Sequence, residues 1–143
     1  MAYMNWNEKL QLNIPDMDSQ HKRWISILNE LHEAVNSGKA AERIGLIINQ
    51  LVNYTKTHLA AEEKFLKSIR YPDLAAHEAI HRKMTDKVME FQAKYDAGDR
   101  AITIQIISFV REWLVNHIQT VDRKYAKYHE STRLKVGTQN ART

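Results

Sequence analysis

The sequence predicts an all-α protein: an up-down-up-down four-helix bundle with an extended arm at its N-terminus. The chain has 143 residues, which suits one domain, and its four Gly and two Pro lie mostly between apolar stretches. Within those stretches apolar residues recur every three or four positions, as on one face of an amphipathic helix. Four such helices joined by short turns can bury all their apolar faces in one bundle.

The first 15 residues are predicted to form an extended arm rather than a helix. Apolar side chains occupy even-numbered positions of this segment: Trp6, Leu10, Leu12 and Ile14. The first helix is expected to begin with Asp18 or Ser19 as its N-cap, because short polar side chains accept the free N–H groups of a first turn. It continues to about Gly38.

Three further helices are predicted from the same periodicity. The second covers residues 40–69 and ends before Pro72, because proline disfavours helical backbone in the residue that precedes it. The third covers residues 73–96, and the fourth covers residues 101–128. Because the loops between these helices are short, consecutive helices are predicted to pack antiparallel to each other.

Most of the net positive charge lies at the C-terminal end. The chain has a formal net charge of +4, but residues 123–143 carry six Lys or Arg and one acid, Glu130, so the remainder is nearly neutral. We predict a bundle domain over residues 1–130 and a basic, flexible tail over residues 131–143. The nearly neutral body predicts that neither nucleic acid nor a membrane is a partner.

The sequence has no apolar run that suits a signal peptide or a membrane span. This predicts a cytoplasmic protein.

Ionisable side chains interrupt the apolar stripes at positions that the helical period assigns to the core. These positions are His21, His58, Glu62, His77, His81 and His117. Buried imidazoles and carboxylates without partners are costly, and a metal centre would satisfy several of them at once. The chain has no Cys, so any metal must be bound by His and carboxylate groups.

Two pairs of these residues have the spacing of neighbours on one helix face. His58 and Glu62 are four residues apart, and so are His77 and His81. An antiparallel hairpin with its turn at Pro72 would bring the two pairs to the same level. Each pair could therefore contribute to a common centre.

The remaining candidates come from the first and fourth helices. His21 lies early in the first helix, and His117 and Asp122 lie late in the fourth, at ends that an up-down bundle places at the same level. A lone inward His is more often a hydrogen-bonded core residue, but five at one depth favour a metal centre. His32 and His129 are interpreted as non-ligands.

Four motifs distributed over nearly the whole chain contain these residues. They are His21, H-x-x-x-E at His58 to Glu62, H-x-x-x-H at His77 to His81, and H-x-x-x-x-D at His117 to Asp122. The pattern resembles the signature of the hemerythrins, in particular the single-domain bacteriohemerythrins. The resemblance extends from Trp6 to about His129.

The resemblance implies two non-haem iron ions, bridged by the carboxylates of Glu62 and Asp122 and by an oxo or hydroxo group. The implied histidine ligands are His77, His81 and His117 for one iron, and His21 and His58 for the other. The second iron has one ligand fewer, and its open position would bind dioxygen. Large apolar residues would surround that position, although ordinary core packing would also account for them: Trp24, Leu59, Trp113 and Leu114.

The resemblance implies reversible dioxygen binding, for storage, delivery or buffering, rather than enzyme activity. Dioxygen and an oxygen-using recipient enzyme would be the partners, and a monomer is expected. Three alternatives stay open: a ferritin-like di-iron oxidase, a sensor of O2 or redox state that acts with a separate partner, and a zinc site. Ferritin-like bundles carry E-x-x-H on two helices, whereas it occurs here once, at Glu78 to His81.

The spacing of His117 and Asp122 does not fit a regular α-helix. Residues five positions apart lie about 140° apart around a helix axis, so the two side chains would not share a face. A π-type turn would bring them together. We therefore predict irregular helix geometry between Asn116 and Arg123.

Overall fold

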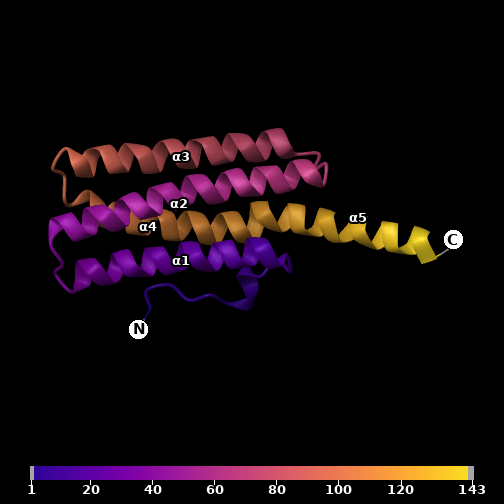
Figure 1. The fold of residues 1–143 in the computed structure, drawn as a ribbon, viewed down its shortest axis with the longest axis horizontal. Helices are drawn as coiled ribbons and strands as arrows, with labels where there is room; N and C mark the ends of the chain where they lie inside the picture. The colour runs from indigo at the N-terminus through magenta and orange to yellow at the C-terminus, as the bar shows by residue number, and fades with distance from the viewer. Residues whose placement is uncertain (1, 142–143) are drawn as a thin grey trace.

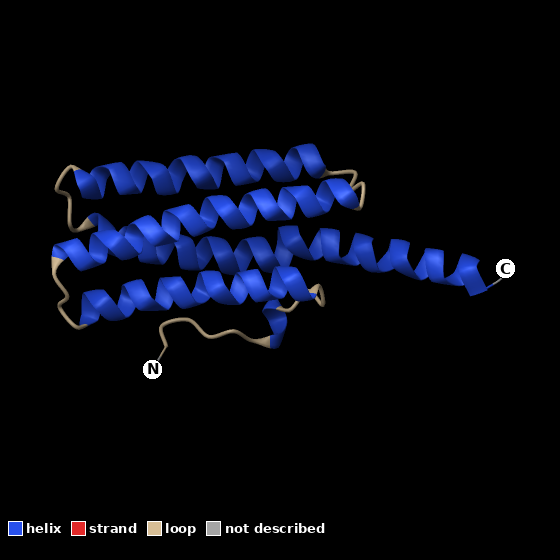
Figure 2. Ribbon diagram, viewed as in Figure 1, coloured by secondary structure: helices blue, strands red, loops and turns tan. Residues whose placement is uncertain are grey.

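A computed structural model describes residues 2–141, with side chains described as far as residue 134. Four helical rods run alternately up and down the molecule (Figure 1). Their segments are α1 (Pro15–Asn36), α2 (Ala41–Ser68), α3 (Leu74–Asp96), and a fourth rod made of α4 (Ile102–Asn116), the π-helical segment η2 (His117–Asp122) and α5 (Arg123–Ala141). The described part of the chain contains helices and loops and no strand (Figure 2). The predicted all-α bundle is confirmed.

Each rod packs on the next one along the chain, and α4 also packs on α1, which closes the bundle. The predicted bounds of the second and third helices agree with those of α2 and α3 to within one residue. Gly38 and Gly98 follow α1 and α3 and adopt φ values of 69° and 109°. These left-handed conformations favour glycine and let the chain reverse direction there.

The first helix begins earlier than predicted. Pro15 is its first residue, because proline lacks the N–H that would be unpaired there and already has a helical φ. The prediction of an N-cap at Asp18 or Ser19 is wrong, since Asp18 lies inside the first turn. Its buried carboxylate instead accepts hydrogen bonds from the backbone N–H groups of Leu12, at 2.8 Å, and Asn13, at 3.1 Å.

The N-terminal arm lies against the bundle through the side chains that the alternation indicated. Leu10, Leu12 and Ile14 are buried, and one short 3-10 turn, η1 (Glu8–Leu10), interrupts the otherwise non-helical segment. The arm also contacts the fourth rod, because the Arg123 guanidinium donates to the carbonyl oxygens of Gln11 and Lys9 at 2.6 Å each. The arm therefore joins the first and last rods at one end of the bundle.

The core has an apolar part and a polar part. Fully buried aliphatic side chains fill the end of the bundle near the α1–α2 and α3–α4 turns; examples are Leu28, Leu31, Ile48, Leu51, Ile106 and Val110. Burying each such side chain stabilises the fold by about 1.5–3 kcal/mol. The buried ionisable residues lie toward the opposite end, near the turn between α2 and α3.

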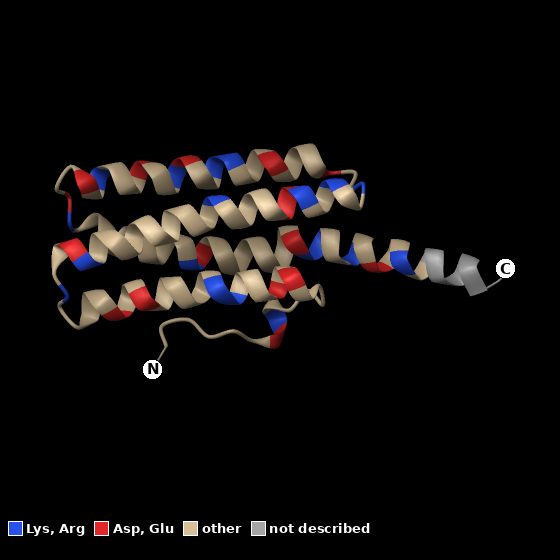
Figure 3. Cartoon of the chain, viewed as in Figure 1, with Lys and Arg blue, Asp and Glu red and all other residues tan. Residues whose placement is uncertain are grey.

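The fourth rod extends beyond the other three (Figure 1). Lys and Arg are frequent along the described part of its projecting end (Figure 3). The prediction of a flexible tail over residues 131–143 stays a prediction: α5 continues to Ala141, while the side chains of residues 135–143 lie outside the described part of the chain. None of the described helices is both long enough and apolar enough to cross a membrane.

The role of Asp18 can be tested with Asp18→Ala. We expect the free energy of unfolding to fall by about 1–3 kcal/mol, because two backbone N–H groups of the arm would lose a charged acceptor. Urea unfolding followed by circular dichroism measures this loss. The matched control is Asp16→Ala, which removes an exposed carboxylate from the same turn; an equal loss in both variants would contradict the assignment.

Candidate metal centre

The seven predicted ligand residues lie together in the core, and all are buried. They come from all four rods: His21 from α1, His58 and Glu62 from α2, His77 and His81 from α3, and His117 and Asp122 from η2. Glu62 and Asp122 are both 0% exposed. Two carboxylates at this depth require compensating charge.

Glu62 stands between two groups of histidines. Its Oε1 lies 2.6 Å from His77 Nε2 and 3.1 Å from His81 Nε2. Its Oε2 lies 3.3 Å from His58 Nε2 and 3.6 Å from His21 Nε2. Each oxygen of one carboxylate therefore faces a different histidine group.

The two carboxylate oxygens of Asp122 likewise face different histidine groups. Its Oδ1 lies 3.0 Å from His117 Nε2 and 3.3 Å from His77 Nε2, whereas its Oδ2 lies 3.4 Å from His21 Nε2. The first group thus contains three histidines, and the second contains two. The two carboxylates span the gap between the groups.

The π-helical segment determines where Asp122 points. η2 begins at His117 and ends at Asp122, the two residues whose spacing is incompatible with a regular α-helix. The extra residue per turn brings both side chains to the inner face, where their polar atoms are 3.0 Å apart. The predicted irregular geometry between Asn116 and Arg123 is confirmed.

Several polar atoms at the centre have no hydrogen-bond partner, although they are buried. They are His21 Nδ1 and Nε2, His81 Nδ1 and Nε2, His117 Nε2, and both carboxylate oxygens of Asp122. Leaving such groups unpaired costs about 1–3 kcal/mol each. Imidazole nitrogens and carboxylate oxygens that converge within 4.8 Å are a suitable donor set for metal ions. The residues present therefore fit a metal centre.

The carboxylates attract positive charge into the centre. Burial lowers the pKa of His21 and His77, but the attraction of the nearby carboxylates of Asp122 and Glu62 outweighs this effect and raises both values to about 9. Burial raises the pKa of Glu62, yet its four facing imidazoles bring it well below the ordinary value. Protons on the imidazoles therefore balance the carboxylates in the metal-free protein. A bound cation takes over this role and releases those protons.

Two residues outside the predicted set also contact the centre. The Tyr125 hydroxyl donates a hydrogen bond to Glu62 Oε2 at 3.1 Å, and burial raises its pKa well above 10, so it remains a donor. Gln20 Oε1 lies 2.7 Å from His58 Nδ1. The ring nitrogen of a metal-binding His that faces away from the metal usually has such a partner. Their positions give little signal in the sequence, because a buried Tyr and a half-buried Gln are ordinary in a helix.

Of the four residues predicted to line the dioxygen pocket, the two tryptophans contact histidines of the cluster. The Trp24 ring lies 5.1 Å from that of His58 and 5.8 Å from that of Trp113, measured between centroids. Trp113 stacks on His117 at 4.0 Å. Leu59 and Leu114 are buried.

The two histidines interpreted as non-ligands lie outside both groups. His32 stacks on Tyr3 at 4.1 Å, and His129 packs against Phe65 at 5.3 Å, measured between centroids. Glu78, the acid of the single E-x-x-H pattern, is also absent from the metal-binding clusters of the described residues. It lines a surface groove between α2 and α3 instead.

Comparison with known proteins identifies the family. The hemerythrin family, described as a hemerythrin HHE cation binding domain, matches residues 12–128. A bacteriohemerythrin of Stenotrophomonas maltophilia is 36% identical over 126 residues, which cover 88% of this chain and 81% of that protein. One from Methylococcus capsulatus is also 36% identical over 126 residues, covering 87% of this chain and 95% of that protein. A crystal structure of wild-type hemerythrin superimposes with a TM-score of 0.82 at 34% identity, over 88% of this chain and 97% of that one. The chain belongs to the hemerythrin family.

Proposed function

We propose that this protein binds dioxygen reversibly at a non-haem di-iron centre. The observation that supports this function is the unequal division of histidines around two shared carboxylates. Two adjacent cations repel each other strongly, and carboxylates between them offset that repulsion and fix their separation. Neutral imidazoles complete the metal environment without further negative charge.

The proposed ligands follow from this geometry. His77, His81 and His117 would hold one iron, His21 and His58 would hold the other, and Glu62 and Asp122 would be shared between the two. The two-histidine iron has one protein ligand fewer, which leaves room for a small molecule. When bound, the iron pair supplies the coordination position and the electrons that dioxygen binding requires.

Buried apolar side chains would limit the access of water to the open coordination position. Trp24, Leu59 and Leu114 are at most 3% exposed. We propose that they and Trp113 form a dry pocket that slows loss of the reduced, oxygen-binding state. Tyr125 and Gln20 act through other residues, by holding Glu62 and His58 in their orientations.

The oxidase alternative is less well supported by the site. Ferritin-like bundles use more carboxylates and a second E-x-x-H motif, whereas Glu78 lies outside the clusters here. Storage, delivery to an oxygen-using enzyme, or buffering all suit a protein that binds dioxygen and releases it unchanged. A monomeric state, a location in the cytoplasm and the identity of a recipient stay predictions.

The function is tested by an optical titration of the iron-loaded, anaerobically reduced protein with O2. We expect a visible charge-transfer band that appears on oxygenation and disappears when inert gas replaces O2. Steady O2 consumption with an added reductant would instead support an oxidase. Irreversible conversion to the oxidised protein on the first addition of O2 would contradict reversible binding.

The ligand set is tested by measuring iron content. We expect His77→Ala to lose stoichiometric iron, because His77 Nε2 faces oxygens of both carboxylates. His129→Ala is the matched control, since that imidazole packs against Phe65 outside the cluster. Equal iron content in the two variants, with both folded by circular dichroism, would refute the assignment.

The hydrogen bond from Tyr125 is tested with Tyr125→Phe. Removing the donor leaves more negative charge on Glu62 Oε2, which favours ferric iron, so we expect the reduction potential to fall. A change of about 1 kcal/mol corresponds to roughly 40 mV for one electron. Spectroelectrochemistry measures this shift. Tyr128→Phe is the control, because its hydroxyl donates to the carbonyls of Ile69 and Arg70; the same shift in both variants would contradict the proposed role.

A further inference from the structure

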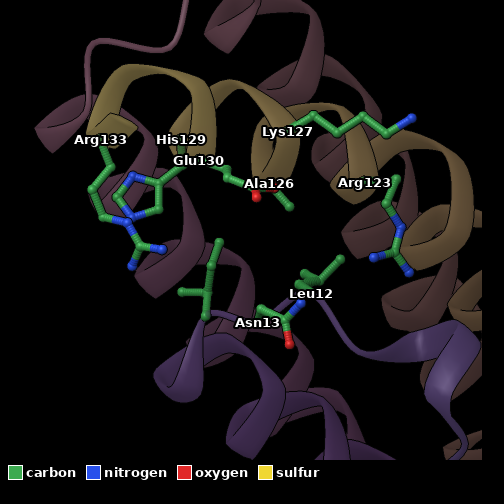
Figure 4. Close-up of a pocket in the computed structure, with 9 residues that line it drawn as sticks. Leu12, Asn13, Arg123, Ala126, Lys127, His129, Glu130 and Arg133 are labelled. Carbon is green, nitrogen blue, oxygen red and sulfur yellow. The ribbon is translucent and has the colours of Figure 1, made fainter. Parts of the chain in front are cut away.

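A basic groove that contains none of the seven cluster residues lies between the N-terminal arm and α5 (Figure 4). It has a volume of about 370 Å³. Leu12, Asn13 and Ile14 form its arm side, and residues of one face of α5 form the other: Arg123, Ala126, Lys127, His129, Glu130 and Arg133. The dioxygen-binding function does not use this groove.

The arm side of the groove is held in place by buried contacts. Asn13 adopts a φ of 62°, and the Asp18 carboxylate binds its N–H and that of Leu12. Leu12, Ile14 and Ala126 are each at most 8% exposed, so they form an apolar floor. A preformed groove loses little conformational entropy when it binds a partner.

Positive charge stands at both ends of the groove. Figure 4 shows Arg123 and Arg133 at opposite ends, with His129 beside Arg133. Arg123 and Arg133 are ten positions apart in the helix, which corresponds to about 15 Å along the axis between their Cα atoms. Lys127 and Arg133 are exposed, and among the described residues no acidic side chain forms an ion pair with either of them. Their charge is therefore available to a partner.

We propose that this groove binds an extended acidic segment of a partner protein. An extended chain advances about 3.3 Å per residue, so acidic residues four positions apart reach both ends of the groove. A residue midway between them lies on the same side of the segment and meets the floor of Leu12, Ile14 and Ala126. The favoured segment is acidic–x–apolar–x–acidic. The negative charge of Glu130 would repel a third acidic residue at the central position of that segment.

The groove suits a polypeptide better than a nucleic acid. The described residues that line it include no Phe, Tyr or Trp on which a base could stack, and Glu130 would repel a continuous phosphate backbone. Residues 1–122 are also nearly neutral, so the positive field is confined to this end of the molecule. Charge pairs at two ends with an apolar centre are instead typical of peptide recognition.

The proposal is tested with the full-length, iron-loaded protein and a fluorescently labelled peptide, Ser-Glu-Ser-Leu-Ser-Glu-Ser. Fluorescence anisotropy at low ionic strength should show saturable binding that weakens with added salt. We expect Arg133→Glu and Lys127→Glu each to weaken binding by about five- to tenfold. The matched control is Lys83→Glu, which reverses an exposed charge on α3 and should leave binding unchanged.

Two further peptides separate charge from apolar contact. Replacing both Glu by Gln, or the Leu by Ser, should each weaken binding at least fivefold. Failure of the parent peptide to bind, or equal weakening by Lys83→Glu, would overturn the proposal. Tighter binding of a single-stranded oligonucleotide that Arg133→Glu also abolishes would overturn it in favour of a nucleic-acid site. None of these outcomes alters the optical titration with O2, so failure here is distinguishable from failure of the proposed function.

Discussion

Two carboxylates buried at the meeting point of four helices are the constraint on which this structure depends. Glu62 and Asp122 are inaccessible to water, and imidazoles from all four rods face their oxygens. Such an arrangement is costly unless positive charge is present, and protons or metal cations can supply it. The long helices hold these residues at one level, so one shared group of protons or metal cations can compensate for the burial of both carboxylates.

Asp122 joins this centre through a local departure from α-helical geometry. Six residues of π-helix turn its carboxylate inward beside His117. Insertions of this kind are often associated with functional sites, since they place a side chain where the α-helical period would not. The same segment leads directly into α5, whose Arg123 binds the N-terminal arm. The metal centre and the arm therefore constrain the same stretch of the fourth rod from opposite sides.

The two histidine groups differ in the number of possible ligands that they contain. The group of three forms a cluster of five possible metal ligands with Glu62 and Asp122, whereas the group of two forms a cluster of three with Glu62. Trp24 packs against His58 of the second group, and Trp113 stacks on His117 of the first. The Tyr125 hydroxyl donates a hydrogen bond to Glu62 Oε2, the oxygen that faces the group of two.

While the family resemblance indicated Asp122, the sequence by itself determined the helical class, the approximate helix bounds and the six other residues of the cluster. It could do so because helical periodicity fixes which side chains face inward, and ionisable residues at those positions are unusual. It even predicted the irregular turn at His117, from a spacing of five. Only the tertiary structure decided which carboxylate oxygen faces which histidine, how Asp18 holds the arm, and that Tyr125 reaches Glu62. Those contacts join residues distant in the sequence, and their geometry depends on how the rods pack rather than on the period of any one helix.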